Sequence, residues 1–168
     1  MLEKIKPVLK LRTTSSWTDH FRDLSKKNKQ NAKYWFWDTF NWESQSLWVG
    51  KLNRMNHLPT TDDQIKKFLG KLIDDLGQST YLKSAVYIKF YFSRNITTHE
   101  PDVNYLMICD TPQIPEDFES TLVDIMFEKY QLTESLISKN DDFKNMIDHY
   151  INWSNFYTYY DLMGELFF

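Results

Sequence analysis

The sequence contains a single cysteine, Cys109, and only four glycines among 168 residues. One cysteine excludes an intramolecular disulfide, and no Gly-rich phosphate-binding loop is present. No segment reaches the roughly 18 apolar residues of a membrane span, and the first residues lack the apolar stretch of a signal peptide. We therefore expect a cytoplasmic protein that does not enter a membrane. Because Cys109 ends an apolar run, we expect it to be a buried structural residue.

Complete catalytic and metal-binding sets are also missing. His99, Glu100 and Asp102 share one loop, but tetrahedral zinc would need a fourth ligand, and the chain contains no CxxC or HxxxH pair. One type of nuclease has an acid two residues before a core-strand lysine, but Tyr87 stands at that position before Lys89. No Gly-x-Ser-x-Gly elbow is present either. We expect a protein that is not an enzyme and binds no metal or cofactor.

Apolar and aromatic residues, in contrast, are abundant. They make up 42% and 17% of the chain, which is enough for a packed core, and the length is typical of one domain covering residues 1–168. Lysine outnumbers arginine 16 to 4, a bias typical of AT-rich genomes such as those of phages, low-GC bacteria and some eukaryotic microbes.

Charge is sorted along the chain. Residues 1–57 hold 11 Lys and Arg against 5 Asp and Glu, whereas residues 114–168 hold 3 against 11. Such asymmetry favours interaction surfaces over catalytic chemistry.

Local patterns predict the secondary structure. Helices are expected after the N-cap Ser16, over 61–76 with a Thr61/Gln64 capping box, from Pro115, and after the cap Asn140. Phe118, Leu122, Ile125 and Met126 are the expected buried stripe of the third helix, and Phe143, Met146, Ile147, Tyr150 and Ile151 that of the last. Strands are expected over 4–12, 33–38, 46–52, 84–93 and 103–109, the last two as a hairpin.

These elements predict an α+β fold with a mainly antiparallel sheet and a C-terminal helical part. Through residue 93 the order strand, helix, strand, strand, helix, strand is compatible with a ferredoxin-like α/β sandwich. Residues 94–168 would then add a strand and an acidic helical portion.

The basic N-terminal third is one candidate binding surface. Five of the six tryptophans fall within residues 17–48, a stretch that also contains several basic residues, and such a mixture suits single-stranded nucleic acid. The alternative is that the tryptophans form core and the lysines a solvated rim. The nucleic-acid candidates are Arg22, Lys26, Lys27, Lys29, Lys33 and Lys89.

The acidic C-terminal third is the other candidate surface. Its final segment, residues 159–168, resembles over about seven residues the terminal peptides with which replication and transcription proteins bind sliding clamps, although the usual leading glutamine is absent and the spacing differs; Leu166, Phe167 and Phe168 are the candidates for contact. The alternative is that this tail packs onto the domain, because an exposed Leu-Phe-Phe segment is costly. The acidic candidates for protein contact are Glu116, Glu119, Glu134, Asp141, Asp142 and Asp148.

The sequence thus favours a non-enzymatic accessory or regulatory protein that binds another macromolecule. Inhibitors, adaptors and assembly factors, including those of phages and mobile elements, are examples of this class. A protein partner for the acidic third is the first expectation, and a nucleic-acid-binding module based on the basic third is the second.

Overall fold

The computed structural model describes residues 16–53, 61–95, 97–152 and 160–168, with only the backbone of residues 95 and 160–167. The helices are α1 (Trp17–Lys27), α2 (Lys29–Thr39), α3 (Asp62–Leu76), α4 (Thr80–Ala85), α5 (Leu122–Met126), α6 (Glu134–Lys139) and α7 (Asp141–Asn152), with a 3₁₀ turn η1 (Glu116–Phe118). The strands are β2 (Ser46–Leu52), β3 (Val86–Asn95), β4 (Pro101–Cys109), β5 (Phe127–Leu132) and β6 (Tyr160–Phe167).

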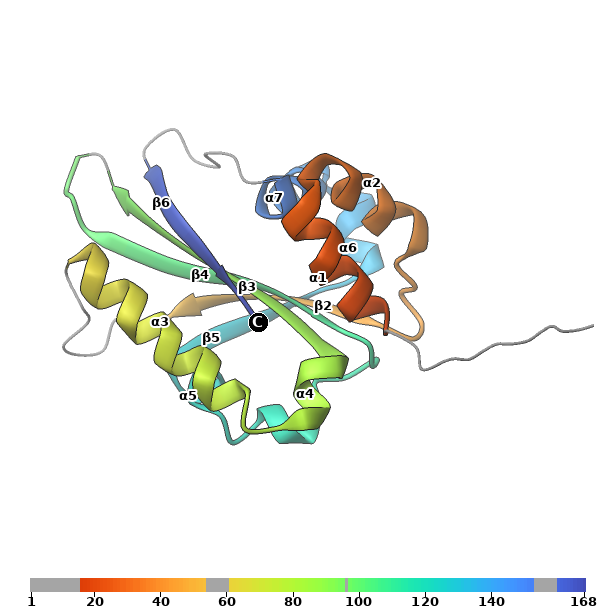
Figure 1. Ribbon diagram of the computed structural model, residues 1–168. Coiled ribbons are helices and arrows are strands. Elements are labelled where there is room, and N and C mark those ends of the chain that lie inside the picture. The colour runs from red at the N-terminus through yellow and green to blue at the C-terminus, as the bar shows by residue number, and fades with distance from the viewer. Residues whose placement is uncertain (1–15, 54–60, 96, 153–159) are drawn as a thin grey trace, which may run out of the picture.

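One antiparallel sheet organises the molecule, in the strand order β5-β2-β4-β3-β6 (Figure 1). The expected hairpin of β3 and β4 is confirmed, with Ile88 opposite Met107 in the register. The α+β class with an antiparallel sheet is therefore confirmed, whereas the ferredoxin-like order is not. The portions before and after residue 93 share this sheet, because β4 lies between β2 and β3.

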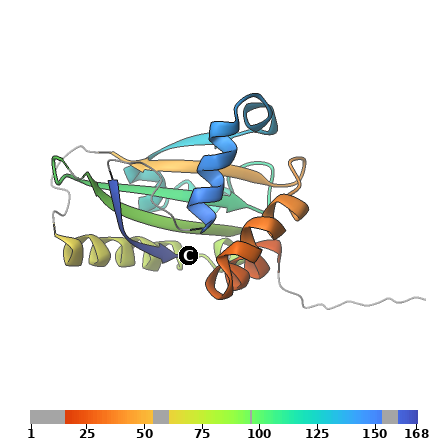
Figure 2. The same cartoon turned by 90° about the horizontal axis from the view of Figure 1, so that it is seen from above.

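Helices cover both faces of the sheet, and Figure 2 shows α3 and α7 on opposite sides of it. Alternate residues of β3 explain this arrangement. Ile88 and Phe90 join the core beneath α3, α4 and α5, and Tyr87 and Tyr91 join the core beneath α1, α2 and α7. A strand buried on both faces needs apolar or aromatic residues at nearly every position, as the sequence 86–92 has.

Local capping determines where the best-predicted helices begin. The Ser16 side chain accepts a hydrogen bond from the Asp19 amide at the start of α1. Thr61 and Gln64 form the predicted capping box of α3. These bonds satisfy amides that have no partner within the helix.

One predicted strand and one predicted helix differ in the structure. Residues 33–38 belong to α2, because Ala32 and Phe36 share a fully buried helical face while the rings on either side remain partly exposed. The helix expected from Pro115 is divided into η1 and α5, and the strand β5, which was not predicted, follows directly. The strand predicted over residues 4–12 lies outside the described residues.

The buried stripes were only partly correct. Phe118 is fully buried, but Leu122 and Ile125 of α5 are 43% and 65% exposed, so their predicted burial is wrong. In α7, Ile147 and Ile151 are buried as predicted, and Phe143, Met146 and Tyr150 pack against the same core.

The C-terminal tail is part of the sheet. Residues 160–167 form β6 and pair with β3, and Phe168 exchanges backbone hydrogen bonds with Ile88 at 2.7 and 3.2 Å. The backbone of Leu166–Phe168 is therefore part of the sheet, which agrees with the alternative of a tail packed onto the domain, and the assignment of these residues to protein contact stays a prediction. Of the part of the chain that is described, no helix has the length and apolar character needed to cross a bilayer.

Candidate functional site

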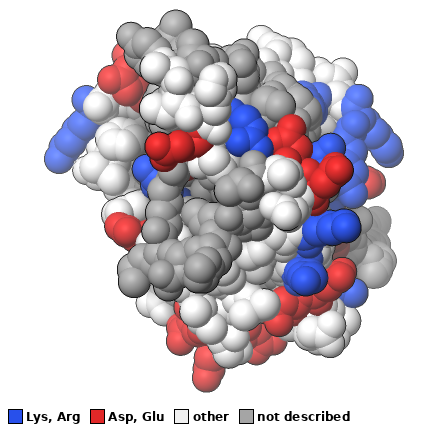
Figure 3. Space-filling model, turned by 90° about the vertical axis from the view of Figure 1, so that its left-hand side faces the viewer, with Lys and Arg blue, Asp and Glu red and all other residues white. Residues whose placement is uncertain are grey.

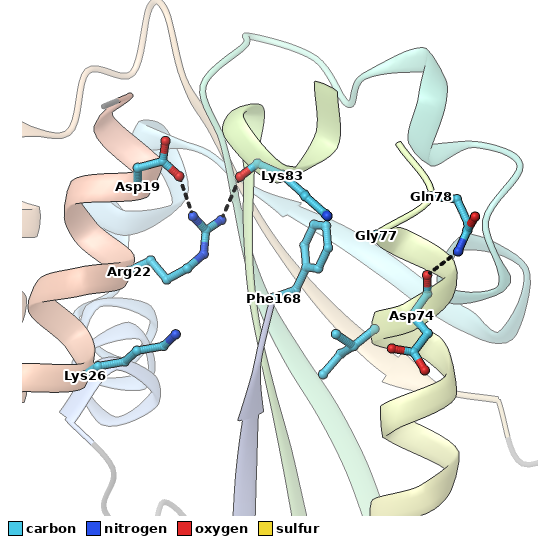
Figure 4. A pocket seen from close by; sticks show the side chains of 9 residues that line it. Asp19, Arg22, Lys26, Asp74, Gly77, Gln78, Lys83 and Phe168 are labelled. Atoms are coloured by element: carbon cyan, nitrogen blue, oxygen red, sulfur yellow. Dashed lines mark hydrogen bonds and ion pairs between the residues drawn. The ribbon is translucent and has the colours of Figure 1, made fainter. Parts of the chain in front are cut away.

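A groove lies between α1 and the C-terminal end of α3, where β6 ends (Figure 4). Its volume is about 770 Å³, within the range of ligand pockets. Three structural elements contribute charged side chains to its walls. The lining residues are Asp19, Arg22, Lys26, Ile73, Asp74, Gly77, Gln78, Lys83 and Phe168.

Arg22 holds one wall of this groove in place. Its guanidinium pairs with Asp19 at 2.6 Å and donates to the carbonyls of Lys83 and Val86 at 3.2 and 2.7 Å. These bonds connect α1 to α4 and to the start of β3. Arg22 thus has a structural role that the nucleic-acid hypothesis did not include.

The other predicted basic residues do not form one surface. Lys26 lines the groove, Lys27 is exposed and faces Asp23 at 4.0 Å, and Lys33 lies over the ring of Tyr34. Lys89 is fully buried and donates to the carbonyl of Ile151 at 3.3 Å. A buried ammonium cannot reach a phosphate backbone, so Lys89 is withdrawn from the nucleic-acid candidates. Lys29 is half-buried at the start of α2.

The tryptophans of this region pack mainly against protein. Trp17 stacks on Trp35 with a centroid distance of 4.9 Å, and the indole NH of Trp37 donates to the Asp148 carboxylate at 2.5 Å. These rings join α1 to α2 and α2 to α7 on one face of the sheet. The structure therefore agrees with the alternative in which the tryptophans are core.

The predicted acidic residues are divided between the two faces of the sheet. Glu116 and Glu119 flank Phe118, which packs in the core under α3, whereas Glu134, Asp141 and Asp142 belong to α6 and α7 on the opposite face. All five are exposed. Asp148 is half-buried and bonded to Trp37, so its assignment to an exposed contact surface is wrong.

Charges of both signs share the face shown in Figure 3. Basic and acidic side chains lie close together in its upper part, whereas its lower rim is mainly acidic. The sheet order contributes to this arrangement, because it pairs β5 of the acidic third with β2 of the basic third.

Exposed apolar residues occur before, within and after β5, which is an edge strand. Among the described residues β5 pairs only with β2. Ile125 two residues before it, Tyr130 within it and Leu136 after it are 65%, 54% and 39% exposed. We call Leu122, Ile125, Tyr130, Leu136 and the outer edge of β5 the β5 surface. Sequence reasoning missed it because β5 was not predicted and Ile125 was expected to be buried.

The charges on the β5 surface are mainly acidic. Lys129 pairs with Asp124 at 2.7 Å, and the Tyr130 hydroxyl donates to the exposed carboxylate of Glu128. That hydrogen bond raises the pKa of Tyr130. Glu119, Glu128 and Glu134 are exposed nearby in the sequence, so the surface would complement a basic partner.

Asp110 and Cys109, at the end of β4, have structural environments. The Asp110 carboxylate accepts hydrogen bonds from the Thr18 amide and hydroxyl, both at 3.2 Å, and from the Gln45 amide at 2.9 Å. Burial raises the pKa of Asp110, and this effect exceeds the opposite effect of these hydrogen bonds, which lower it. Burial also raises the pKa of the Cys109 thiol to about 12, so this cysteine is protonated and poorly nucleophilic.

The loop with His99, Glu100 and Asp102 does not assemble a metal site. His99 has a φ of 62°, and its carbonyl accepts a hydrogen bond from Arg94. Asp102 accepts from the Asn104 side-chain amide at 3.2 Å. Within the described ranges, no three His, Cys, Asp or Glu side chains come together in a way that would hold a metal ion.

Comparisons with protein-family models and with curated protein sequences found no match for this chain. The functional argument therefore depends on the geometry of the groove and of the β5 surface.

Proposed function

We propose that this protein is a non-enzymatic accessory or regulatory protein that binds another protein through the β5 surface. The observation that supports this proposal is the number of exposed apolar side chains around the open edge of β5, on α5 at one face of the sheet and on β5 and α6 at the other. Six large hydrophobic residues are exposed in the described part of the chain, and four of them lie between residues 122 and 136. Exposed apolar side chains beside an open strand edge are typical of interaction sites, because exposing them is otherwise costly.

The open edge of β5 also offers backbone hydrogen bonds to a partner. An open strand edge presents backbone amides and carbonyls that an extended segment of a partner can pair with. Side chains of Ile125 and Tyr130 would then supply apolar contact beside the added strand. The surrounding carboxylates favour a partner segment that carries lysine or arginine.

Site-specific photo-crosslinking in cells that naturally carry the protein tests this proposal. A photoreactive phenylalanine derivative placed at position 130 should form a discrete protein adduct. The matched control is position 34, because Tyr34 is 59% exposed but lies on α2. We expect adducts from position 130 only.

Charge substitution makes the test specific to the surface. Ile125→Lys should abolish the adduct formed from position 130, because it places a cation among the apolar contacts. Tyr34→Lys should leave that adduct unchanged. Equal adducts from positions 34 and 130, or no adduct from position 130, would contradict the proposed function.

The alternative function, a nucleic-acid-binding module, stays a prediction. In the described residues the tryptophan rings pack mainly against protein and Lys89 is buried, so these observations support the protein-binding proposal instead.

A further inference from the structure

The open edge of β5 exposes the backbone groups of alternate residues, and the hydrogen bonds of the sheet show which residues these are. The Asn53 amide donates to the Met126 carbonyl at 2.9 Å, and the two residues are opposite each other when the β2–β5 register is continued by one pair. Hydrogen-bonded pairs alternate with non-hydrogen-bonded pairs in an antiparallel ladder. The even-numbered residues of β5 therefore direct their backbone groups toward β2. The odd-numbered residues, which direct theirs toward the open edge, are Phe127, Lys129 and Gln131.

A second hydrogen bond, elsewhere in the sheet, agrees with this alternation. The Asp110 amide donates to the Ala85 carbonyl at 2.8 Å, so the even-numbered residues of β4 face β3 and the odd-numbered ones face β2. The even-numbered residues of β2 then pair with β4, which leaves its odd-numbered residues facing β5. These odd-numbered residues are opposite the even-numbered residues of β5 in the register.

The outward backbone groups are open at two of the three edge residues. The Phe127 amide is already used, because it donates to the Val123 carbonyl at the end of α5. In the described part of the chain, no hydrogen bond engages the backbone amides of Lys129 and Gln131. Pairing with an added strand would therefore be centred on Lys129 and Gln131 and would end beside α5.

We propose that this edge binds an antiparallel strand of the partner in which a hydrophobic residue precedes a lysine or arginine by two positions, an inference that rests on the protein-binding function proposed above. A strand of this pattern already lies on the inner side of β5. In β2, Val49 is opposite Tyr130 and Lys51 is opposite Glu128. The antiparallel direction matches the rest of the sheet and gives slightly more stable pairing per residue.

The side chains of β5 favour the same pattern on the outer side. Tyr130 is 54% exposed, and the neighbouring carboxylate of Glu128 is exposed on the same face of the strand. Pairs of an aromatic with a β-branched residue and pairs of opposite charge both stabilise neighbouring strands. On the outer side Glu128 and Tyr130 occupy non-hydrogen-bonded positions, where side chains of opposed residues approach more closely than in hydrogen-bonded pairs. The outer pairs would therefore be at least as intimate as the pairs with β2.

An added strand also explains why exposed apolar residues flank the edge on both faces of the sheet. Ile125 belongs to α5, which packs on the side of α3. Tyr130 shares the opposite face with Leu132, which packs in the core beneath α1, α2 and α7. Because successive side chains of a strand point to opposite faces, one partner strand can contact both sets.

Two synthetic peptides blocked at both ends test the recognised order. Ser-Thr-Val-Thr-Lys-Thr-Ser and Ser-Thr-Lys-Thr-Val-Thr-Ser have the same composition and net charge but place valine and lysine in opposite order. The first should shift the amide resonances of Lys129 and Gln131 in the full-length protein saturably, and it should bind at least about fivefold more tightly than the second. Equal binding of the two peptides, or no saturable shift with either, would overturn the proposal.

N-methylated forms of the first peptide test the backbone pairing. A methyl group on the amide of the threonine between valine and lysine removes the donor to the Lys129 carbonyl and should weaken binding by at least about tenfold. A methyl group on the lysine amide is the matched control, because that amide would point away from β5, and it should weaken binding much less. Equal losses for the two methylated peptides would contradict strand addition.

Substitutions in the protein give the reciprocal test. Lys129→Pro removes an amide that faces outward, which an edge strand tolerates, whereas Lys129→Ala retains that amide and loses the same ion pair with Asp124. The proline variant should bind the first peptide at least about tenfold more weakly than the alanine variant. Thermal unfolding checks that both variants fold, and the methylated peptides decide the question if the proline variant does not. Glu128→Lys should reverse the charge preference, so that a peptide with glutamate in place of lysine binds more tightly.

Failure of this inference is distinguishable from failure of the proposed function. An adduct from position 130 that forms equally in the Lys129→Pro and Lys129→Ala proteins would show that the partner binds through side chains alone, which overturns strand addition but leaves the protein-binding function in place. Absence of any adduct from position 130 in the otherwise native protein would instead contradict the protein-binding function itself.

Discussion

Tyr105 lies directly over Gly50 in the register between β4 and β2, and its ring occupies the space that a side chain at position 50 would need. A Cβ atom at Gly50 would stand 2.2 Å from two carbons of the ring. The ring is fully buried and packs on Phe127 with a centroid distance of 5.1 Å. Glycine at position 50 is therefore required by packing rather than by backbone conformation.

Gly50→Ala should destabilise the protein by about 1–3 kcal/mol, the usual cost of forcing an extra methyl group into a packed core. The control is Gly70→Ala in α3, where an added Cβ meets no atom within 4 Å. Because alanine is the better helix former, Gly70→Ala should stabilise the protein by about 0.5–1 kcal/mol. Urea unfolding measures both changes, and equal stability of the two variants would contradict this account.

As the pH falls from neutral, the free energy of unfolding of the native sequence should rise relative to that of the Asp110→Asn variant. Burial raises the pKa of Asp110 in the folded state, so the fold favours the protonated carboxyl. The stability that the protonated Asp110 carboxyl contributes is complete below the pKa of the unfolded state. It is lost as the pH rises through the pKa of the folded state. Unfolding free energies of both proteins should be compared between neutral pH and the ordinary carboxyl range. A difference that is constant with pH, or that shrinks on acidification, would refute the expected shift.

Cys109 should resist alkylation in the native protein. With a pKa of about 12, roughly one thiol in ten thousand is ionised at pH 8, and the side chain is fully buried. Iodoacetamide should react slowly until denaturant is added, as mass spectrometry would show. A variant carrying Ser44→Cys, at an exposed position, should react rapidly at that site under the same conditions. Rapid native reaction of Cys109 would mean that the end of β4 opens readily.

The bond between Trp37 and Asp148 should contribute measurably to stability. Trp37→Phe keeps an aromatic ring between α2 and α7 but leaves the half-buried Asp148 without this 2.5 Å hydrogen bond, at an expected cost of about 1–2 kcal/mol. Asp148→Lys should also destabilise, whereas Asp142→Lys, at an exposed position of the same helix, should change stability little. A double-mutant cycle of Trp37→Phe with Asp148→Ala measures the coupling, and additive effects would show that the bond is unimportant.

Capping motifs and hydrophobic periodicity were sufficient to predict a helix or strand wherever the pattern lies within that element. The Thr61 capping box and the spacing of Ile65, Leu69, Leu72 and Leu76 predict α3, and all four side chains are buried. The alternation in residues 86–92 likewise predicts the two faces of β3. Both patterns are local, because they depend on the residues of one element and the geometry of its own backbone.

Residues 34–37 had no such signal. Their aromatic rings occupy every position, and only contact with α1 and α7 decides that α2 is a helix with Phe36 innermost. The same limit applied to the candidate sites. The groove brings together Lys26, a nucleic-acid candidate, and Phe168, a protein-contact candidate, which sequence reasoning had assigned to different surfaces.

The sequence by itself determined the α+β class, the caps, the faces of β3 and the burial of Cys109, because these depend on local periodicity and composition. Tertiary structure alone decided that residues 127–132 form a strand, since β5 exists by pairing with β2. It also decided that Lys89 is buried, that the final residues complete the sheet, and that β5 of the acidic third lies beside β2 of the basic third. Each of these outcomes depends on a partner segment distant in the sequence, and no local pattern specifies which segment that will be.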